Sequence, residues 1–353
     1  MQFDQSKRRE LITLLGSASA ARWPLAVRAV GYCAGNRLRE ARTGATSMQT
    51  VMNWLCWPFL LAILGTYTAV AQEKGTLHPR PLPAIQDPED PSTPAKEFFA
   101  RKRTPAALEP AAIGFYSKGC LAGAAPLPID GPQWQVMRIS RNRYWGHPDL
   151  IASLETIARK ASDIGWPGLL VGDIAQPRGG PMLTGHSSHQ MGLDADIWFR
   201  AMPRRALTPL EREEMMSTVV VAADRRNINP KIWTRQHADL LKVTAEEPRV
   251  ERIFVNAAIK KALCEKTKGD RAWLAKMRPW WEHDYHFHVR ITCPSGSLEC
   301  TPQEPPLSED GCGRELEDWL SAAAQPSAPV SPPKAPLTVD DLPPLCRTVL
   351  NAQ

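Results

Sequence analysis

Three sequence patterns that would indicate a familiar kind of zinc site or a repeat architecture are missing from this chain. The 353 residues contain no H-E-x-x-H sequence, which excludes a zinc site on one helix of the thermolysin type. They contain no C-x2-C pair, which argues against the usual zinc ribbons. They also show no internal repeat, so a repeat architecture is not expected.

An excess of charge is missing from most of the chain as well. Residues 1–71 hold eight Lys and Arg and three acidic side chains, and the remaining 282 residues carry 35 basic and 34 acidic side chains. Proteins that bind nucleic acid through its phosphates need a basic surface. A body this close to neutral gives no reason to expect a nucleic-acid partner.

The N-terminal region, residues 1–71, is typical of an export signal. Residues 54–64 are an apolar run, and Ala69-Val70-Ala71 supplies the small-x-small pattern of a cleavage point. Residues 7–21 resemble a degenerate twin-arginine signal, so we interpret 1–47 as a possible upstream extension before a start at Met48. An 11-residue run is too short to span a bilayer. We therefore expect no stable membrane anchor after cleavage; a membrane-tethered N-terminus is the alternative.

Cysteine usage also favours export. Outside Cys33 and Cys56 of the N-terminal region, the number of cysteines is even, as a disulfide set in an oxidising compartment requires. They are Cys120, Cys264, Cys293, Cys300, Cys312 and Cys346. The sequence alone permits many pairings of these six. A structural zinc site made by the four from Cys264 to Cys312 is the alternative.

Composition divides the chain into four parts. The export region, 1–71, precedes a proline-rich arm, 72–97, a domain, 98–320, and a proline-rich C-terminal tail, 321–353. Proline density of this kind gives extended chain rather than packed elements. A cysteine at position 346 indicates that the tail is tied back onto the domain.

Within the domain, helical and strand patterns alternate, which predicts an α+β fold with a small antiparallel sheet, flanked by helices and disulfide-tied loops. Capping signals and apolar residues at helical spacing predict helices over residues 148–161, 208–220, 232–246 and 257–266. Short apolar or alternating runs predict strands over residues 169–174, 193–199, 252–256 and 285–291.

Five of the eight histidines fall in two short stretches, residues 185–199 and 280–291. Side chains alternate along a strand, so the apolar residues of each stretch would share one face and the polar residues the other. The polar set of the second stretch is His286, His288 and Arg290. That of the first is Asp194 and Asp196, preceded on a turn by His186 and His189. If the two strands are neighbours, imidazole and carboxylate groups meet across them.

Zinc suits such a set. A catalytic zinc uses three protein ligands, commonly imidazole and carboxylate, and leaves a position for water. It activates that water for attack on an amide carbonyl, and a nearby histidine can act as general base. A single histidine is usually a core or surface residue, and we assign that role to His78, His147 and His237. Two clusters on strand patterns are hard to explain in that way.

The two stretches resemble the zinc signature of known peptidoglycan peptidases. His189 to Asp196 gives H-x6-D and His286 to His288 gives H-x-H, as in the peptidases grouped with lysostaphin and D-Ala-D-Ala peptidases. The fuller resemblance, over about residues 110–350, is to the penicillin-insensitive murein endopeptidases of Gram-negative bacteria. It is carried by SRNRYWGHP, GHSSHQ, RIFVN and HFHVR, at residues 140–148, 185–190, 252–256 and 286–290.

The resemblance implies a role for each histidine and aspartate of the set. It implies that His189, Asp196 and His288 hold Zn²⁺, with His186 also at the metal site. It implies that His286 is the catalytic base and that His283 stabilises the transition state.

The resemblance also bears on the cysteines and on a second metal. It implies the disulfides Cys120–Cys346, Cys264–Cys312 and Cys293–Cys300. Some relatives hold a second metal partly through an Asp and a His three residues apart. The matching positions here are Asp224 and Asn227, so the second set lacks its imidazole.

The implied reaction is hydrolysis of the D-alanyl–meso-diaminopimelyl cross-links between peptidoglycan stem peptides, in the periplasm. Penicillin insensitivity follows because a zinc-activated water leaves no serine for a β-lactam to acylate. A D,D-carboxypeptidase or dipeptidase with the same metal site is one alternative. An inactive exported peptidoglycan-binding protein is another, although a binder has no need of His283 and His286. The oligomeric state stays open, and a homodimer is one of the states allowed.

Trp280 and Trp281 directly precede the second histidine stretch. They could line a substrate cleft, but tryptophans beside a strand are more often part of the core. We therefore expect both in the core.

Overall fold

A computed structural model describes residues 74–306, 309–322 and 335–353. The predicted export signal region lies outside the described residues. Within them, no helix is both long enough and apolar enough to cross a bilayer. Regular structure begins with the short helix α2 (Ala95–Phe99), after a stretch from residue 74 to 93 without helix or strand.

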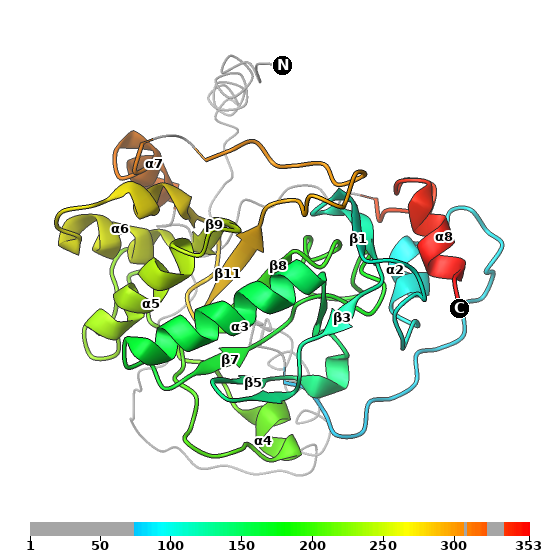
Figure 1. The fold of residues 1–353 in the computed structure, drawn as a ribbon, viewed down its shortest axis with the longest axis horizontal. Helices are drawn as coiled ribbons and strands as arrows, with labels where there is room; N and C mark the ends of the chain where they lie inside the picture. The colour runs from blue at the N-terminus through cyan, green and yellow to red at the C-terminus, as the bar shows by residue number, and fades with distance from the viewer. Residues whose placement is uncertain (1–73, 307–308, 323–334) are drawn as a thin grey trace, which may run out of the picture. The chain divides into compact units, whose positions relative to one another are not determined.

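The centre of the fold is a seven-stranded sheet in the order β10-β9-β11-β8-β7-β5-β4 (Figure 1). In that order the strands are Met277–Pro279, Val250–Val255, His286–Ile291, Asp194–Trp198, Leu169–Val171, Trp134–Val136 and Asp130–Gly131. The pairs β9-β11, β11-β8 and β8-β7 are antiparallel. The prediction of an α+β fold is confirmed.

The sheet differs from the prediction in being larger and mixed. β10 pairs with β9 in parallel, and β5 pairs with β7 in parallel. The helix α6 (Ala257–Lys266) lies in the connection from β9 to β10, and α3 (Pro148–Asp163) lies in that from β5 to β7. Parallel neighbours need a crossover of this length. The sequence prediction missed β4, β5 and β10 because runs of two or three residues show no alternation.

Helices agree with the prediction where the capping signals are strong. α6 has the predicted bounds, and the side chain of Asn256 accepts a hydrogen bond from the Ala258 N–H at its start. At the start of α3, His147 accepts from the Asp149 N–H, so this histidine has the structural role assigned to it. α5 (Arg235–Ala245) begins three residues later than expected.

The helix predicted over residues 208–220 is wrong in its second half. α4 (Pro209–Glu214) has the predicted capping box at Thr208, but its C-cap residue Met215 is extended, with ψ 132°. The N–H of Val220 donates to the Asp284 carbonyl instead of an i−4 partner, and Val221 forms a bridge with Ile228. Tertiary hydrogen bonds therefore outweigh the apolar periodicity after Glu214.

One face of the sheet is covered by α3, with α5 beside it (Figure 1). The buried cluster under α3 joins helix residues such as Leu154 to strand residues such as Ile197, Phe287 and Val289. Since side chains alternate along a strand, the other residues of β8 and β11 lie on the face away from this core. That opposite face holds the polar set.

A second apolar cluster joins the two ends of the described chain. It packs α2 and the hairpin β1 (Ala111–Phe115) and β2 (Lys118–Ala122) against α8 (Leu345–Asn351), which lie together in Figure 1. A separate two-stranded pair is formed by β3 (Ala125–Pro126) and β6 (Trp145–Gly146).

Three disulfides tie these parts together. They are Cys120–Cys346, Cys264–Cys312 and Cys293–Cys300, the pairings that the family resemblance implies. The alternative of a four-cysteine zinc site is wrong, because the four cysteines concerned are paired in two disulfides.

Candidate metal centre

The two histidine stretches lie on neighbouring strands, the condition on which the expected site depends. β11 pairs with β8 so that His288 lies opposite Asp196, His286 opposite Trp198 and Arg290 opposite Asp194. Phe287 and Val289 are fully buried in the core. The polar residues of both strands therefore share the face that α3 does not cover.

Asp196 lies at the centre of this face with four imidazoles around its carboxylate. Its Oδ1 is 3.5 Å from His189 Nε2, 3.6 Å from His286 Nε2 and 3.4 Å from His288 Nδ1. Its Oδ2 is 3.4 Å from His186 Nε2. The tightest group is His186, His189 and Asp196, whose ligand atoms all lie within 4.8 Å of one another; His286 and His288 adjoin it from β11.

His189 reaches this position from a strained turn. Its φ is 69°, and the following turn closes through Gly192, also at positive φ. The ring Nδ1–H donates to the Ile174 carbonyl at 2.6 Å, which leaves Nε2 without a proton and directed at Asp196. The side chain of His189 is fully buried.

Atoms of this cluster are buried without a hydrogen-bond partner. They include His189 Nε2, Asp196 Oδ1 and His286 Nδ1. Buried polar atoms are rarely left unpaired, because each costs the desolvation of the group. Two facing acceptors, an imidazole nitrogen and a carboxylate oxygen, cannot satisfy each other but can both coordinate a cation. The donor set therefore fits a metal such as zinc.

Electrostatics keep the carboxylate charged and two of the imidazoles neutral. Burial alone raises the pKa of Asp196, but the surrounding histidines, His286 first, outweigh it and hold that pKa well below its ordinary value. Burial lowers the pKa of His286 to about 3 and that of His288 to about 4, against the attraction of the nearby aspartates. Carboxylate and neutral imidazole are the forms that bind a metal or accept a proton.

Asp194 supports two of the expected ligands at once. Its carboxylate accepts from Arg290 Nε at 2.7 Å and Nη2 at 3.0 Å. It also accepts from the His189 N–H at 3.0 Å and lies 3.2 Å from His288 Nε2. The negative charge beside His288 Nε2 favours a proton on that nitrogen, so that Nδ1 faces Asp196. The sequence placed Asp194 on the right face but did not reveal this role.

Asp173 forms a second support beside His186. A single oxygen, Oδ2, lies 3.1 Å from Arg141 Nη1, 2.9 Å from Arg143 Nη1 and 3.2 Å from His186 Nε2. Two guanidinium groups and one imidazole thus share one carboxylate oxygen. Sequence reasoning missed Asp173, although it lies within the strand predicted over residues 169–174, and gave the two arginines of the SRNRY motif no role.

A pocket opens beside the cluster. It is lined by Arg138, Arg141, Gly172, Asp173, His186, Asp196, Trp198, Tyr285 and His286. His186 and Asp196 of the cluster, the expected base His286 and two arginines therefore line the same pocket. His283 lies behind His286, with the two ring centroids 4.8 Å apart, and its Nδ1–H donates to the Trp281 carbonyl at 2.6 Å.

Backbone strain is concentrated in the segments that build this site. Six non-glycine residues of the described chain have positive φ, and five of them are Arg138, Asn142, His189, Glu282 and His283. Such conformations persist where surrounding contacts enforce them, often at functional sites.

The positions matched to a second metal do not form such a group. Asp224 Oδ2 accepts from Asn227 Nδ2 at 2.7 Å, and its Oδ1 accepts from the N–H groups of Arg226 and Asn227. The Asp224 carboxylate thus closes its own turn. In the described part of the chain, His186, His189 and Asp196 are the one group of three whose ligand atoms all lie within 4.8 Å of one another.

Comparisons with known proteins agree with the resemblance of the motifs. A family model described as penicillin-insensitive murein endopeptidase matches residues 112–351. A penicillin-insensitive murein endopeptidase of Haemophilus influenzae is 45% identical over 240 residues, 68% of this chain and 82% of that protein. One of Klebsiella pneumoniae is 43% identical over 68% of this chain and 85% of its own length. One of Yersinia enterocolitica is 43% identical over 70% and 88%.

Proposed function

The chain belongs to the penicillin-insensitive murein endopeptidase family, and from this premise we propose that it is a zinc peptidase that hydrolyses the D-alanyl–meso-diaminopimelyl cross-links of peptidoglycan. The single observation that carries the proposal is the buried Asp196 carboxylate, facing His186, His189, His286 and His288 within 3.6 Å. The packing of a hydrophobic core does not explain four imidazole rings around one carboxylate.

We assign the zinc ligands to His189, Asp196 and His288, with His186 at the edge of the same site. The Nε2 of His189 and the Nδ1 of His288 each lie within 3.5 Å of the unpaired Oδ1 of Asp196. His186 is shared between Asp173 and Asp196, so it could either complete the ligand set or orient substrate. Bound zinc would supply Lewis acidity, lowering the pKa of a water and polarising an amide carbonyl.

We assign the general base to His286. Its ring is buried and neutral, and its Nε2 is directed at the same oxygen of Asp196 as the ligands. A neutral imidazole there can accept a proton from the attacking water and return it to the leaving amine. Asp196 then stabilises the imidazolium that forms.

His283 is proposed to stabilise the negative charge that develops on the scissile carbonyl oxygen. Its Nδ1–H is already donated to the Trp281 carbonyl. It can therefore donate to substrate only through Nε2, when the ring is doubly protonated. Burial lowers the pKa of His283, so that form requires a negative charge beside it, as the transition state provides.

The proposed function also implies a compartment and a division of the chain into parts. Three disulfides agree with an extracytoplasmic protein, and we propose the periplasm, after removal of an export signal within residues 1–71. We propose residues 98–320 as the catalytic domain, between a proline-rich arm, 72–97, and a tail, 321–353.

The test uses purified mature protein with three muropeptides: a cross-linked dimer, a monomer ending in D-Ala-D-Ala, and a monomer without it. An endopeptidase converts dimers to monomers, which mass spectrometry detects. A D,D-carboxypeptidase would remove the terminal D-Ala and leave the dimer intact. Retention of muropeptides without any product would support the binding protein instead. His286→Ala prepared in parallel is the control for contaminating hydrolases.

A further inference from the structure

Three tryptophans form an exposed cluster next to the proposed active site. Trp280 exposes 50% of its surface, the one aromatic among the exposed large apolar side chains of the described residues. Trp281 and Trp319 are half-buried. The ring of Trp319 lies 5.9 Å from that of Trp280 and 5.4 Å from that of Trp281. The expectation that Trp280 and Trp281 belong to the core is therefore wrong.

The third tryptophan comes from a distant part of the chain and is held firmly. Trp319 lies on α7 (Arg314–Ala322), which packs beside α6 (Figure 1). Glu315 on α7 pairs with Arg278 of β10, the strand that leads directly into Trp280. Arg278 lies two residues before Trp280, and Glu315 lies four residues before Trp319. The ion pair therefore restrains the two indole rings relative to one another.

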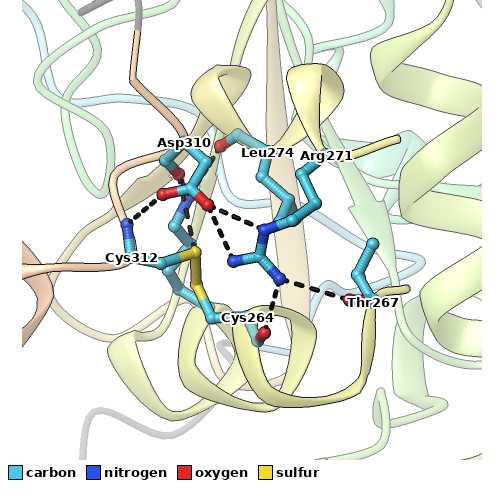
Figure 2. The surroundings of a disulfide bond; sticks show 7 residues. Cys264, Thr267, Arg271, Leu274, Asp310 and Cys312 are labelled. Atoms are coloured by element: carbon cyan, nitrogen blue, oxygen red, sulfur yellow. Dashed lines mark hydrogen bonds and ion pairs between the residues drawn. A yellow bond between two sulfur atoms is a disulfide. The ribbon is translucent and has the colours of Figure 1, made fainter. Parts of the chain in front are cut away.

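A network before α7 adds to this restraint. Figure 2 shows the Cys264–Cys312 disulfide, with Asp310 accepting from the Cys312 N–H and paired to Arg271. Arg271 also donates to the carbonyls of Cys264 and Thr267, at 2.8 Å and 3.2 Å. The tryptophan cluster is thus fixed before any ligand arrives, which lowers the entropic cost of binding.

The cluster is continuous with the catalytic face through one residue. Phe254 of β9 lies opposite His288 in the sheet. Its ring centroid is 5.7 Å from Trp280 and 5.2 Å from His288. A polymer bound at the proposed catalytic site can therefore extend along the surface of the protein onto the tryptophans.

We propose that Trp280, Trp281 and Trp319 bind the glycan strand of peptidoglycan, through the apolar C–H faces of its N-acetylated amino sugars. The electron-rich face of an indole attracts such C–H groups, and aromatic platforms are common in sites for partly apolar ligands. Exposed acidic residues lie within two positions of the tryptophans in the sequence, Glu282, Glu317 and Asp318, and carboxylates of this kind can accept hydrogen bonds from sugar hydroxyls. This proposal rests on the proposed function, because stem peptides hang from that glycan. A single well-exposed indole offers little area for a second copy of the chain.

The test measures binding of a β-1,4-linked N-acetylglucosamine hexamer by calorimetry and tryptophan fluorescence. The native protein should bind it saturably, and Trp280→Ala and Trp319→Ala should each bind about tenfold more weakly. Trp280→Phe should be intermediate, because it keeps an aromatic face. Leu298→Ala is the control, since Leu298 is 92% exposed and lies in the loop closed by Cys293–Cys300. Melting temperatures should stay unchanged for all four variants.

A second measurement separates this proposal from the proposed function. Rates are compared for cross-linked fragments that retain their glycan strands and for the same peptide dimers with the glycan removed. The native protein should prefer the former, and Trp280→Ala should lose that preference. If the protein hydrolyses dimers but does not bind the hexamer, the proposed glycan binding is wrong and the proposed function stands. If it binds the hexamer but hydrolyses no dimer, the proposed enzymatic function is wrong and the glycan binding stands. A concentration-dependent dimer that Trp280→Ala abolishes would assign the cluster to self-association and also overturn the platform.

Discussion

Replacing Asp194 by asparagine should weaken zinc binding without removing any proposed ligand. Asp194 contacts the His189 backbone and the far side of the His288 ring, so it fixes the orientation of both. Loss of a carboxylate that orients a metal-ligating histidine typically costs about 10–100-fold in metal affinity. We expect Asp194→Asn to fall in this range, because asparagine keeps the shape but no longer fixes the proton of His288 on Nε2.

The same substitution should also reduce stability, and the structure indicates by how much. Arg290 would lose its charge partner while remaining 7% exposed, and breaking a buried pair typically costs about 3–5 kcal/mol. Arg290 keeps a hydrogen bond to Gln303 at 2.6 Å and its position over the Tyr116 ring at 3.8 Å. We therefore expect a loss near the lower limit, about 3 kcal/mol in the free energy of unfolding.

A competition titration against a zinc chelator, on protein verified as folded, measures the affinity, and urea unfolding of the metal-free proteins measures stability. Gln303→Ala is the matched control, since it removes the other acceptor of Arg290 and touches neither expected ligand. It should lose stability and keep its zinc affinity. Equal zinc affinity in Asp194→Asn and the native protein, with the His288 tautomer unchanged by ¹⁵N NMR, would refute the reasoning.

Three further predictions concern other parts of the chain. His286→Ala should retain zinc, and its turnover should fall by about 10²–10⁴-fold. If His286→Ala loses zinc as readily as His288→Ala does, the two roles are reversed. Replacing both Cys120 and Cys346 by serine opens the longest disulfide loop, 226 residues, and should cost about 5 kcal/mol by the chain-entropy estimate. Urea unfolding checks this, and thiol counting on denatured, unreduced protein should find no free thiol among the six. Burial lowers the pKa of Lys260 from 10.5 to about 7. The unfolded chain therefore binds the extra proton between these values, and stability should rise with pH across that window, by up to about 5 kcal/mol. In Lys260→Met, unfolding at pH 6.5 and 9.5 should no longer show this rise.

The sequence predicted the elements whose signals are local and missed what depends on distant segments. Alternation placed Asp194, Asp196, His286 and His288 on one face because a strand leaves no other arrangement. Short strands such as β5 and β10 carry no pattern of their own and form through their neighbours.

Other features of the site came from pairing across the chain. The role of Asp173 depends on Arg141 and Arg143, about 30 residues earlier, and no spacing rule connects them. Trp280 was assigned to the core because tryptophans beside a strand are more often buried, and nothing near it in the sequence shows that it packs against Trp319 of the distant helix α7. The disulfide pairing followed from family resemblance alone, since spacing cannot select one pairing.

The central claim is that a metal ion held by His189, Asp196 and His288 is required for cleavage of peptidoglycan cross-links. The most direct measurement is dimer cleavage by native protein stripped with a chelator and then titrated with zinc, with bound metal measured alongside. Cleavage should vanish on stripping and return in proportion to zinc, with full activity at one ion per chain. His288→Ala should not recover. Undiminished cleavage by metal-free protein would contradict the account.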